Sequence, residues 1–141
     1  MNYLLKLAFV GLLFVTSANA TEIDSKGAKV TYLDFWASWC APCRQSLAWM
    51  NELQAKYGGK GLKIIAVNVE EDTEGAKQFL KSIDPTYEIQ FDPEGTLPAK
   101  FDVQAMPTSF ILDSTGKVVK SFEGLHGDEQ KEIEEIISSS L

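Results

Sequence analysis

The two cysteines are the feature that most constrains what this chain can fold into. Cys40 and Cys43 are the only cysteines among 141 residues, and only Ala41 and Pro42 separate them. A disulfide stabilises a fold mainly by closing a long loop of the unfolded chain, so a bridge across so short a loop contributes little stability. The pair is therefore predicted to act chemically.

The cysteines lie where a strand pattern gives way to a helical one. Residues 30–36 are apolar, β-branched or aromatic except for one Asp, whereas apolar residues recur at helical spacing over 42–57. We expect Cys40 at or just before the first turn of that helix, where free N–H groups and the helix dipole stabilise a thiolate. Its pKa should then lie below the usual value of about 8.5, so Cys40 is expected to be exposed and to act as the attacking thiol. Pro42 suits a first turn, and Cys43, one turn deeper, is expected to be the resolving thiol.

Other uses of paired cysteines remain open at this stage. Zinc sites need about four ligands, and with His126 as the only histidine the chain supplies at most three of the usual nitrogen and sulfur ligands. A copper carrier could use Cys40, Cys43 and His126, because thiolates select Cu(I). A thiol peroxidase could use Cys40 alone. His126 itself lies in a Gly-flanked turn, where we expect it to be solvated.

Residues 1–20 are expected to be a signal peptide. Lys6 precedes an apolar run from Leu7 to Val15, and residues 18–20 (Ala-Asn-Ala) fit the small-residue cleavage pattern. The run is about half the roughly 20 residues of a membrane span. The prediction is therefore export to the periplasm without stable membrane insertion after cleavage; an uncleaved anchor is the alternative.

Residues 21–141 are expected to form one domain. Cleavage after Ala20 would remove Lys6 with the signal peptide. The remaining 121 residues would carry 12 Lys and Arg against 20 Asp and Glu, a net charge of −8. Such acidity argues against nucleic acid or an anionic membrane surface as the partner, since both require a basic surface. We expect a monomer.

The remaining pattern predicts an α/β fold with a mixed, mostly parallel central sheet and helices on both faces. Residues 21–29 are expected to be a tail or a brief edge strand. Further elements are expected as a strand at 62–69, a helix through Ile83, a short strand at 87–91, a short helical or irregular segment at 97–103, strands at 108–112 and 117–123 joined by a turn at 113–116, and a last helix from Gly127. Chemistry in such sheets gathers at the carboxyl ends of the strands.

Asp34 is the one charged residue in the predicted central strand. A carboxylate buried there costs several kcal/mol unless it is protonated or paired, so its pKa should rise. The alternative is a strand-edge Asp that reaches water. Of the tryptophans, Trp39 is expected to be exposed beside Cys40, whereas Trp36 and Trp49 are expected to pack in the core or on a helix face.

The segment from Asp34 to Cys43 (DFWASWCAPC) strongly resembles the thioredoxin active site, and Met106-Pro107-Thr108 resembles the cis-proline loop of that superfamily. The extra helix and strand between Thr73 and Phe91 are similar to those of TlpA/ResA-type exported thiol:disulfide oxidoreductases. In two respects the chain departs from many TlpA-type proteins: they carry Asn at the position of Asp34, and an acidic residue where Arg44-Gln45-Ser46 follows the second cysteine.

The resemblance implies a thioredoxin fold with an inserted helix-strand unit before the cis-proline loop. It implies reduction of disulfides in exported proteins, including apocytochrome c, with electrons from a membrane thiol-reductase and no cofactor beyond the Cys40–Cys43 disulfide. It also assigns proton transfer with Cys43 to Asp34. Substrate contacts are implied for a cis Met106–Pro107 pair and for Trp39, Ala41 and Pro42.

Overall fold

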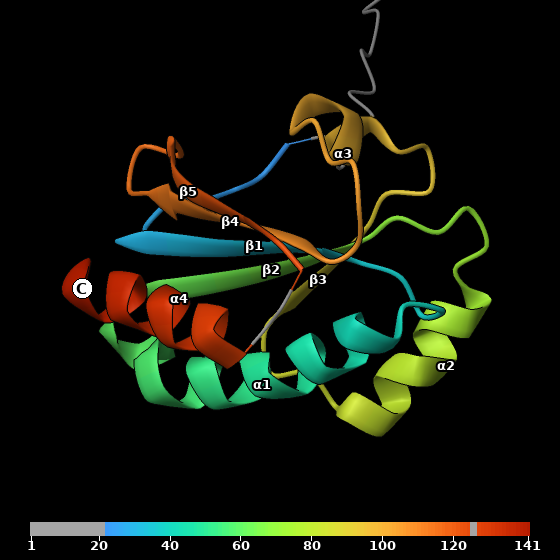
Figure 1. The fold of residues 1–141 in the computed structure, drawn as a ribbon, viewed down its shortest axis with the longest axis horizontal. Coiled ribbons are helices and arrows are strands. Elements are labelled where there is room, and N and C mark those ends of the chain that lie inside the picture. The colour runs from blue at the N-terminus through green and yellow to red at the C-terminus, as the bar shows by residue number, and fades with distance from the viewer. Residues whose placement is uncertain (1–21, 125–126) are drawn as a thin grey trace, which may run out of the picture.

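Figure 1 shows the fold in a computed structural model, which describes residues 22–124 and 127–141. The predicted signal peptide, residues 1–20, and His126 lie outside the described residues. The strands are β1 (Val30–Trp36), β2 (Leu62–Asn68), β3 (Glu88–Phe91), β4 (Thr108–Asp113) and β5 (Val118–Glu123). The helices are α1 (Ala41–Tyr57), α2 (Glu74–Ile83), α3 (Thr96–Lys100) and α4 (Gly127–Ser139), with a 3₁₀ turn, η1 (Gly58–Lys60).

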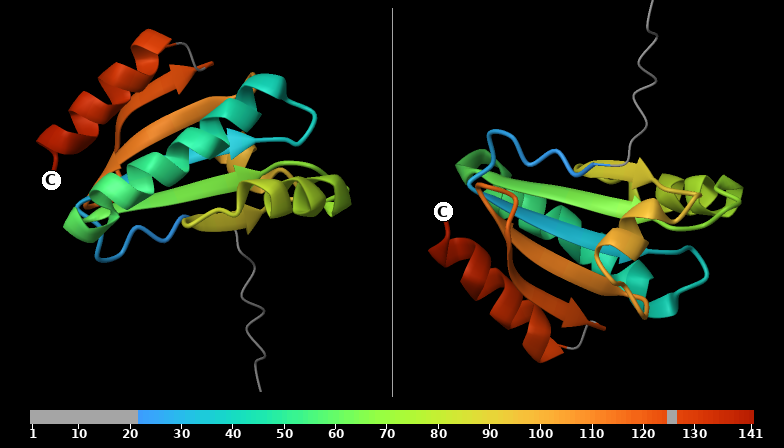
Figure 2. Two further views of the ribbon diagram at one scale, coloured as in Figure 1. Left: turned by 90° about the horizontal axis from the view of Figure 1, so that it is seen from below. Right: turned by 90° about the horizontal axis from the view of Figure 1, so that it is seen from above.

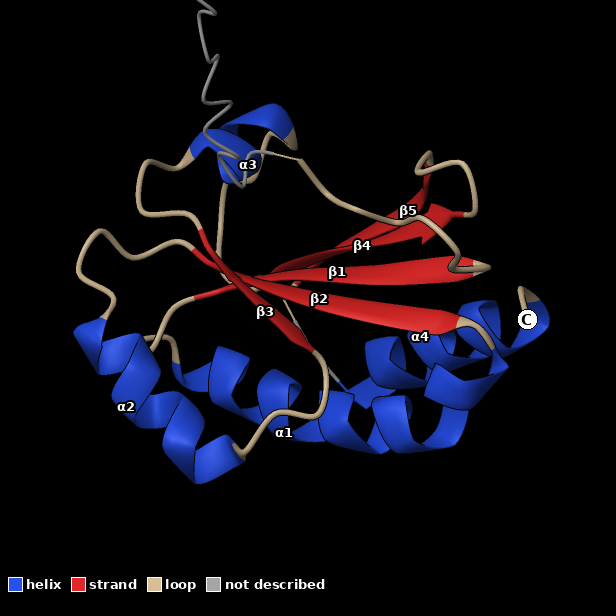
Figure 3. Ribbon diagram, turned by 180° about the vertical axis from the view of Figure 1, so that it is seen from behind, coloured by secondary structure: helices blue, strands red, loops and turns tan. Residues whose placement is uncertain are grey.

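The strands form one mixed sheet in the order β3-β2-β1-β4-β5 (Figure 3). Strand β2 is parallel to both β1 and β3, while β4 is antiparallel to β1 and to β5. β4 therefore runs against the other four strands, and the sheet is mostly parallel as predicted. Strand β1 lies at the centre, so both of its faces are covered and all of its residues are buried.

Helices cover both faces of the sheet, which confirms the predicted α/β class and thioredoxin fold. Helices α1 and α4 lie on one face and α3 on the other (Figures 1 and 2). The inserted unit, α2 with β3, extends the sheet beyond β2. Because β3 pairs in parallel with β2, the chain between them must cross over, and α2 is that crossover.

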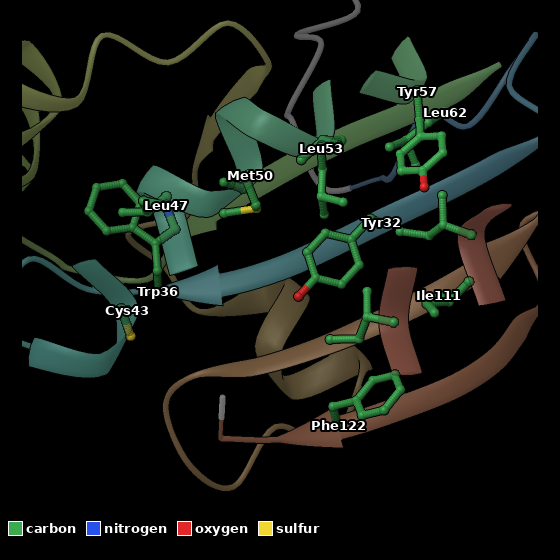
Figure 4. Packing of buried hydrophobic residues seen from close by; sticks show 14 of the residues in the cluster. Tyr32, Trp36, Cys43, Leu47, Met50, Leu53, Tyr57, Leu62, Ile111 and Phe122 are labelled. Atoms are coloured by element: carbon green, nitrogen blue, oxygen red, sulfur yellow. The ribbon is translucent and has the colours of Figure 1, made fainter. Parts of the chain in front are cut away.

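The larger core lies between the sheet and helices α1 and α4 (Figure 4). Alternate residues of β1 point into it, and α1 contributes its apolar stripe. Its buried members include Tyr32, Trp36, Cys43, Leu47, Met50, Leu53, Ile111, Ile133 and Ile137. The smaller core, on the α3 face, contains Leu33, Phe35, Ile65, Val67, Leu97, Phe110 and Leu112.

The structure decides between the alternatives left open for residues 21–29 and for the tryptophans. Residues 22–29 form no strand; they run irregularly through a turn with Gly27 at a φ of 78°, and Ile23 packs against the smaller core. Trp36 is fully buried as predicted, whereas Trp49 is half-buried and meets Tyr32 edge to face, with ring centroids 6.1 Å apart. Over residues 22–124 and 127–141, no helix is long and apolar enough to span a membrane.

Leu53 offers a direct test of the larger core. Its side chain is 1% exposed between α1 and the sheet, so Leu53→Ala should lower the free energy of unfolding by about 2–5 kcal/mol through lost burial and a residual cavity. Glu52→Ala, at the exposed neighbouring position, should change it by no more than about 0.5 kcal/mol. Urea denaturation measures both variants, and equal effects would contradict the assigned packing.

Candidate active site

The two cysteines form a disulfide at the start of α1, with their Cα atoms 5.3 Å apart. Cys40 is the N-cap residue, with extended backbone, and its own N–H donates to the Ala37 carbonyl at 3.1 Å. The backbone N–H of Cys43 donates to Cys40 Sγ at 3.3 Å. The sulfur thus occupies the place of an N-cap oxygen, where helix N–H groups favour negative charge.

Both cysteines are largely covered, which corrects the expectation of an exposed Cys40. Cys40 is 5% exposed and Cys43 is fully buried. The reason is that Cys40 Sγ is bonded to the buried Cys43 Sγ and accepts the Cys43 N–H. The accessible surface at this point comes instead from Trp39, which is 71% exposed, and from the exposed residues Ala41 and Pro42.

Asp34 lies in the middle of β1 and is 1% exposed. Its Oδ1 accepts a hydrogen bond from Ser46 Oγ at 3.4 Å, and its Oδ2 has no partner among the described residues. Burial raises the pKa of Asp34 to about 8, and the bond from Ser46 opposes this only weakly. The predicted rise is confirmed. The strand-edge alternative is wrong, because β1 is the central strand.

Other polar side chains gather around Asp34 in the larger core. Ser109 pairs directly with Asp34 across β1 and β4, and Tyr32 lies two residues away on the same face of β1. Burial and then the charge of Asp34 raise the pKa of Tyr32, and the same two causes raise the pKa of Tyr87. Ser46 lies one helical turn after Cys43, so Asp34 sits below the part of α1 that carries the buried cysteine.

The Met106–Pro107 peptide bond is cis. The register pairs Phe35 with Thr108, so this peptide precedes β4 at the end of the sheet where β1 leads into the cysteine loop. Pro107 is buried, and its carbonyl accepts the Gly124 N–H at 2.7 Å. Met106 is half-buried against the core that contains both cysteines.

The structure adds site residues that the sequence did not reveal. Both carboxylate oxygens of Glu70 accept hydrogen bonds from Ser38, two residues before Cys40, and Arg44 donates to the Ser38 carbonyl. Asn68 in turn donates to Glu70 at 2.8 Å. One signal was present: Asn68 and Glu70 fall at the carboxyl end of a parallel strand next to β1.

The described part of the chain contains no cluster of side chains that could bind a metal ion. No group of three or more His, Cys, Asp and Glu side chains that could hold a metal ion occurs within residues 22–124 and 127–141. The copper alternative depends on His126, which lies outside the described residues.

A CxxC disulfide that caps a helix at the carboxyl end of a central strand, in a thioredoxin fold, defines a thiol:disulfide oxidoreductase. The family model described as Redoxin matches residues 13–137, and the chain belongs to this family. It is 38% identical over 120 residues to the thiol-disulfide oxidoreductase ResA of Bacillus thuringiensis subsp. konkukian, an alignment covering 84% of this chain and 69% of ResA.

Solved structures agree with this assignment. A protein from Chlorobium tepidum, described as a thiol:disulfide interchange protein DsbE, superposes with a TM-score of 0.78 at 43% identity, over 82% of each chain. StoA from Bacillus subtilis superposes with a TM-score of 0.66 at 30% identity, over 77% of this chain and 82% of StoA. The resemblance to TlpA/ResA-like proteins is confirmed.

The buried carboxyl of Asp34 predicts an unusual dependence of stability on pH. Its pKa of about 8 when folded exceeds the unfolded value of about 4, so the folded state holds the proton more tightly. This contribution to stability is complete below about pH 4 and is lost as the pH rises to about 8, at up to about 1.4 kcal/mol per pH unit.

Asp34→Asn should remove this slope, because the amide does not titrate. We expect the oxidised variant to gain stability relative to wild type as the pH rises from 5 to 8, measured by urea denaturation at each pH. Glu52→Gln, at an exposed position of α1, is the control for loss of one carboxylate and should follow wild type. Wild-type and Asp34→Asn curves that stay parallel would contradict the assignment.

Proposed function

We propose that this thiol:disulfide oxidoreductase is exported and reduces disulfides of other exported proteins through Cys40 and Cys43. The observation that carries the proposal is the hydrogen bond from the Cys43 N–H to Cys40 Sγ at the start of α1. When the disulfide is reduced, the same N–H and the helix dipole are placed to stabilise a thiolate on Cys40. A thiolate, and not a thiol, attacks disulfides.

The reaction proceeds in two exchange steps. The Cys40 thiolate attacks one sulfur of the substrate disulfide, forms a mixed disulfide and releases the other substrate sulfur as a thiolate. Cys43, deprotonated, then attacks Cys40 Sγ and releases the second substrate sulfur. The substrate gains two electrons, and the enzyme returns to the Cys40–Cys43 disulfide present in the structure.

Asp34 is proposed to take the proton from Cys43 in the second step. Its pKa of about 8 allows it to exist in both protonation states near neutral pH, which a general base requires. The bond from Ser46 holds the carboxyl below α1, on the side where Cys43 is buried. On the return reaction the same carboxyl would give the proton back.

Substrate binding is assigned to the surface around the cysteines. Trp39 offers a large exposed apolar area, and Ala41 and Pro42 continue this surface on the first turn of α1. Met106 and Pro107 lie at the same end of the sheet, where the Met106 backbone is proposed to pair with an extended substrate segment.

The proposed location outside the cytoplasm suggests the electron donor and the substrate. Thiols outside the cytoplasm tend to be oxidised, so a reductant there needs a dedicated source of electrons, proposed to be a membrane thiol-reductase. Apocytochrome c is a proposed substrate. No further cofactor is proposed, because the reduced Cys40/Cys43 dithiol carries both electrons. The acidic chain is proposed to act as a monomer without nucleic acid.

Single cysteine variants separate the two proposed roles. Cys40→Ser should lower the rate of protein-disulfide reduction by at least about a thousandfold, because the attacking sulfur is gone. Cys43→Ser should instead attack once and remain as a mixed disulfide with the substrate, visible as an intact covalent adduct by mass spectrometry. An adduct formed by Cys40→Ser and not by Cys43→Ser would reverse the assignment.

The equilibrium potential of the Cys40/Cys43 couple tests the proposed direction. Known couples extend from about −270 mV for thioredoxin to about −120 mV for the oxidant DsbA. A reductant should lie near the thioredoxin value, measured in dithiothreitol or glutathione buffers. A potential above about −150 mV would mean that the protein oxidises its substrates.

A further inference from the structure

Ser38, in the loop between β1 and α1, is held at each of its polar atoms. Its N–H donates to Glu70 Oε2 at 2.7 Å and its Oγ donates to Glu70 Oε1, also at 2.7 Å. Its carbonyl accepts from Arg44 Nε at 3.2 Å and from Arg44 Nη2 at 3.0 Å. So many contacts are unusual for one residue of a surface loop, where backbone groups commonly face water.

Glu70 is itself anchored to the sheet. Asn68, the fully buried last residue of β2, donates from Nδ2 to Glu70 Oε2 at 2.8 Å, and its Oδ1 accepts the Glu70 N–H at 3.2 Å. The register pairs Asn68 with Trp36, the last residue of β1. The Ser38 network, formed by Ser38, Asn68, Glu70 and Arg44, therefore joins the cysteine loop to the buried end of the neighbouring strand.

The charges of the network strengthen it. Burial opposes ionisation of Glu70, but the hydrogen bonds from Asn68 and Ser38 outweigh burial and lower its pKa. Glu70 therefore stays ionised at neutral pH, and hydrogen bonds to an ionised acceptor are about twice as strong as neutral ones. The Arg44 guanidinium, which donates to the Ser38 carbonyl, also lies 4.8 Å from the ring centroid of Phe79 in α2.

The network fixes the loop position directly before Trp39. Ser38 is followed at once by Trp39, which is 71% exposed, and then by Cys40. Cys40 is held by contacts of its own, with the Ala37 carbonyl and the Cys43 N–H. The Ser38 network can therefore orient the surface that a protein substrate meets without changing the environment of the reactive sulfur.

We infer that Glu70 is a positioning residue that, through Ser38, orients Trp39 for the docking of protein disulfides. The inference rests on the proposed function and adds a determinant of substrate binding to it. A small disulfide needs only access to Cys40 Sγ, whereas a protein disulfide must also dock on the surface around Trp39. Loss of the network should therefore raise KM for a protein disulfide and spare a small one.

The test compares Glu70→Gln with Glu71→Gln. The amide oxygen of Gln cannot replace two carboxylate oxygens that accept from three donors. Glu71 is the exposed neighbour, so its variant loses the same charge and leaves the network intact. Ser38→Ala, which removes only the Oγ donor, is a milder second variant should Glu70→Gln fail to fold.

We expect Glu70→Gln to raise KM for a protein disulfide, such as insulin, about tenfold, with kcat and the rate with a small aromatic disulfide changed less than about twofold. Ser38→Ala should raise KM about threefold, and Glu71→Gln should match wild type. Amide hydrogen exchange at Ser38, followed by NMR, should be at least about tenfold faster in Glu70→Gln than in wild type. Glu71→Gln should leave it unchanged.

Three results would overturn the inference. Unchanged Ser38 amide exchange in Glu70→Gln would show that the network does not hold the loop. Equal losses with protein and small disulfides would place the effect at the sulfur and not at docking. Faster Ser38 exchange with an unchanged KM would separate the loop from substrate binding. A wild-type protein that reduces neither substrate would instead refute the proposed function, while the amide measurement would still decide whether Glu70 holds Ser38.

Discussion

The hydrogen bond between the Cys43 N–H and Cys40 Sγ makes the reactive sulfur part of the helix start. A helix begins with N–H groups that have no partner within the helix, and an N-cap side chain normally satisfies one of them. Here that side chain is the cysteine sulfur. The same contact therefore ends the loop after β1, begins α1 and offers a donor to a negative charge on Cys40. Helix formation and sulfur chemistry cannot be separated at this point of the chain.

The two faces of β1 serve different purposes. On the α3 face β1 presents two apolar side chains, Leu33 and Phe35, and one uncharged polar side chain, Thr31. On the α1 face Asp34 interrupts the apolar row between Tyr32 and Trp36, and this burial of a carboxyl opposes stability near neutral pH. An apolar residue at position 34 would remove that cost. Ser46, one helical turn after Cys43, holds the carboxyl, and this is the place where Asp34 is proposed to exchange a proton with the buried thiol.

Local signals made much of the fold predictable. Strand β1 has the predicted bounds because its composition favours a strand throughout, and the helix after it begins where the cysteine motif and Pro42 indicate. The turn before β5 was equally readable: Asp113 Oδ1 accepts the N–H groups of Thr115 and Lys117, and Gly116 adopts a φ of 83°. Each of these contacts joins residues within four positions of one another.

The parts that the sequence did not reveal depend on contacts between distant segments. Glu70 meets Ser38 only because the β1–β2 register places Asn68 opposite Trp36, and 32 residues separate the two partners. Nothing in the local pattern distinguishes Glu70 from the acidic residues beside it. The coverage of Cys40 is of the same kind, since its neighbours in the core come from several elements. Helix propensity and hydrophobic spacing carry no information on such pairs.

The inserted unit takes part in placing the active-site helix. The side chain of Asn51 in α1 donates to the Ile83 carbonyl at 3.1 Å and accepts from the Thr86 N–H at 2.9 Å. Tyr87 donates to the Leu47 carbonyl at 2.7 Å. Within α2, Phe79 packs against Trp36, with ring centroids 6.1 Å apart. Because α1 carries Cys43 and Ser46, these contacts help to set the position of both side chains relative to Asp34. A change within the insertion can therefore alter the chemistry at the cysteines without touching them.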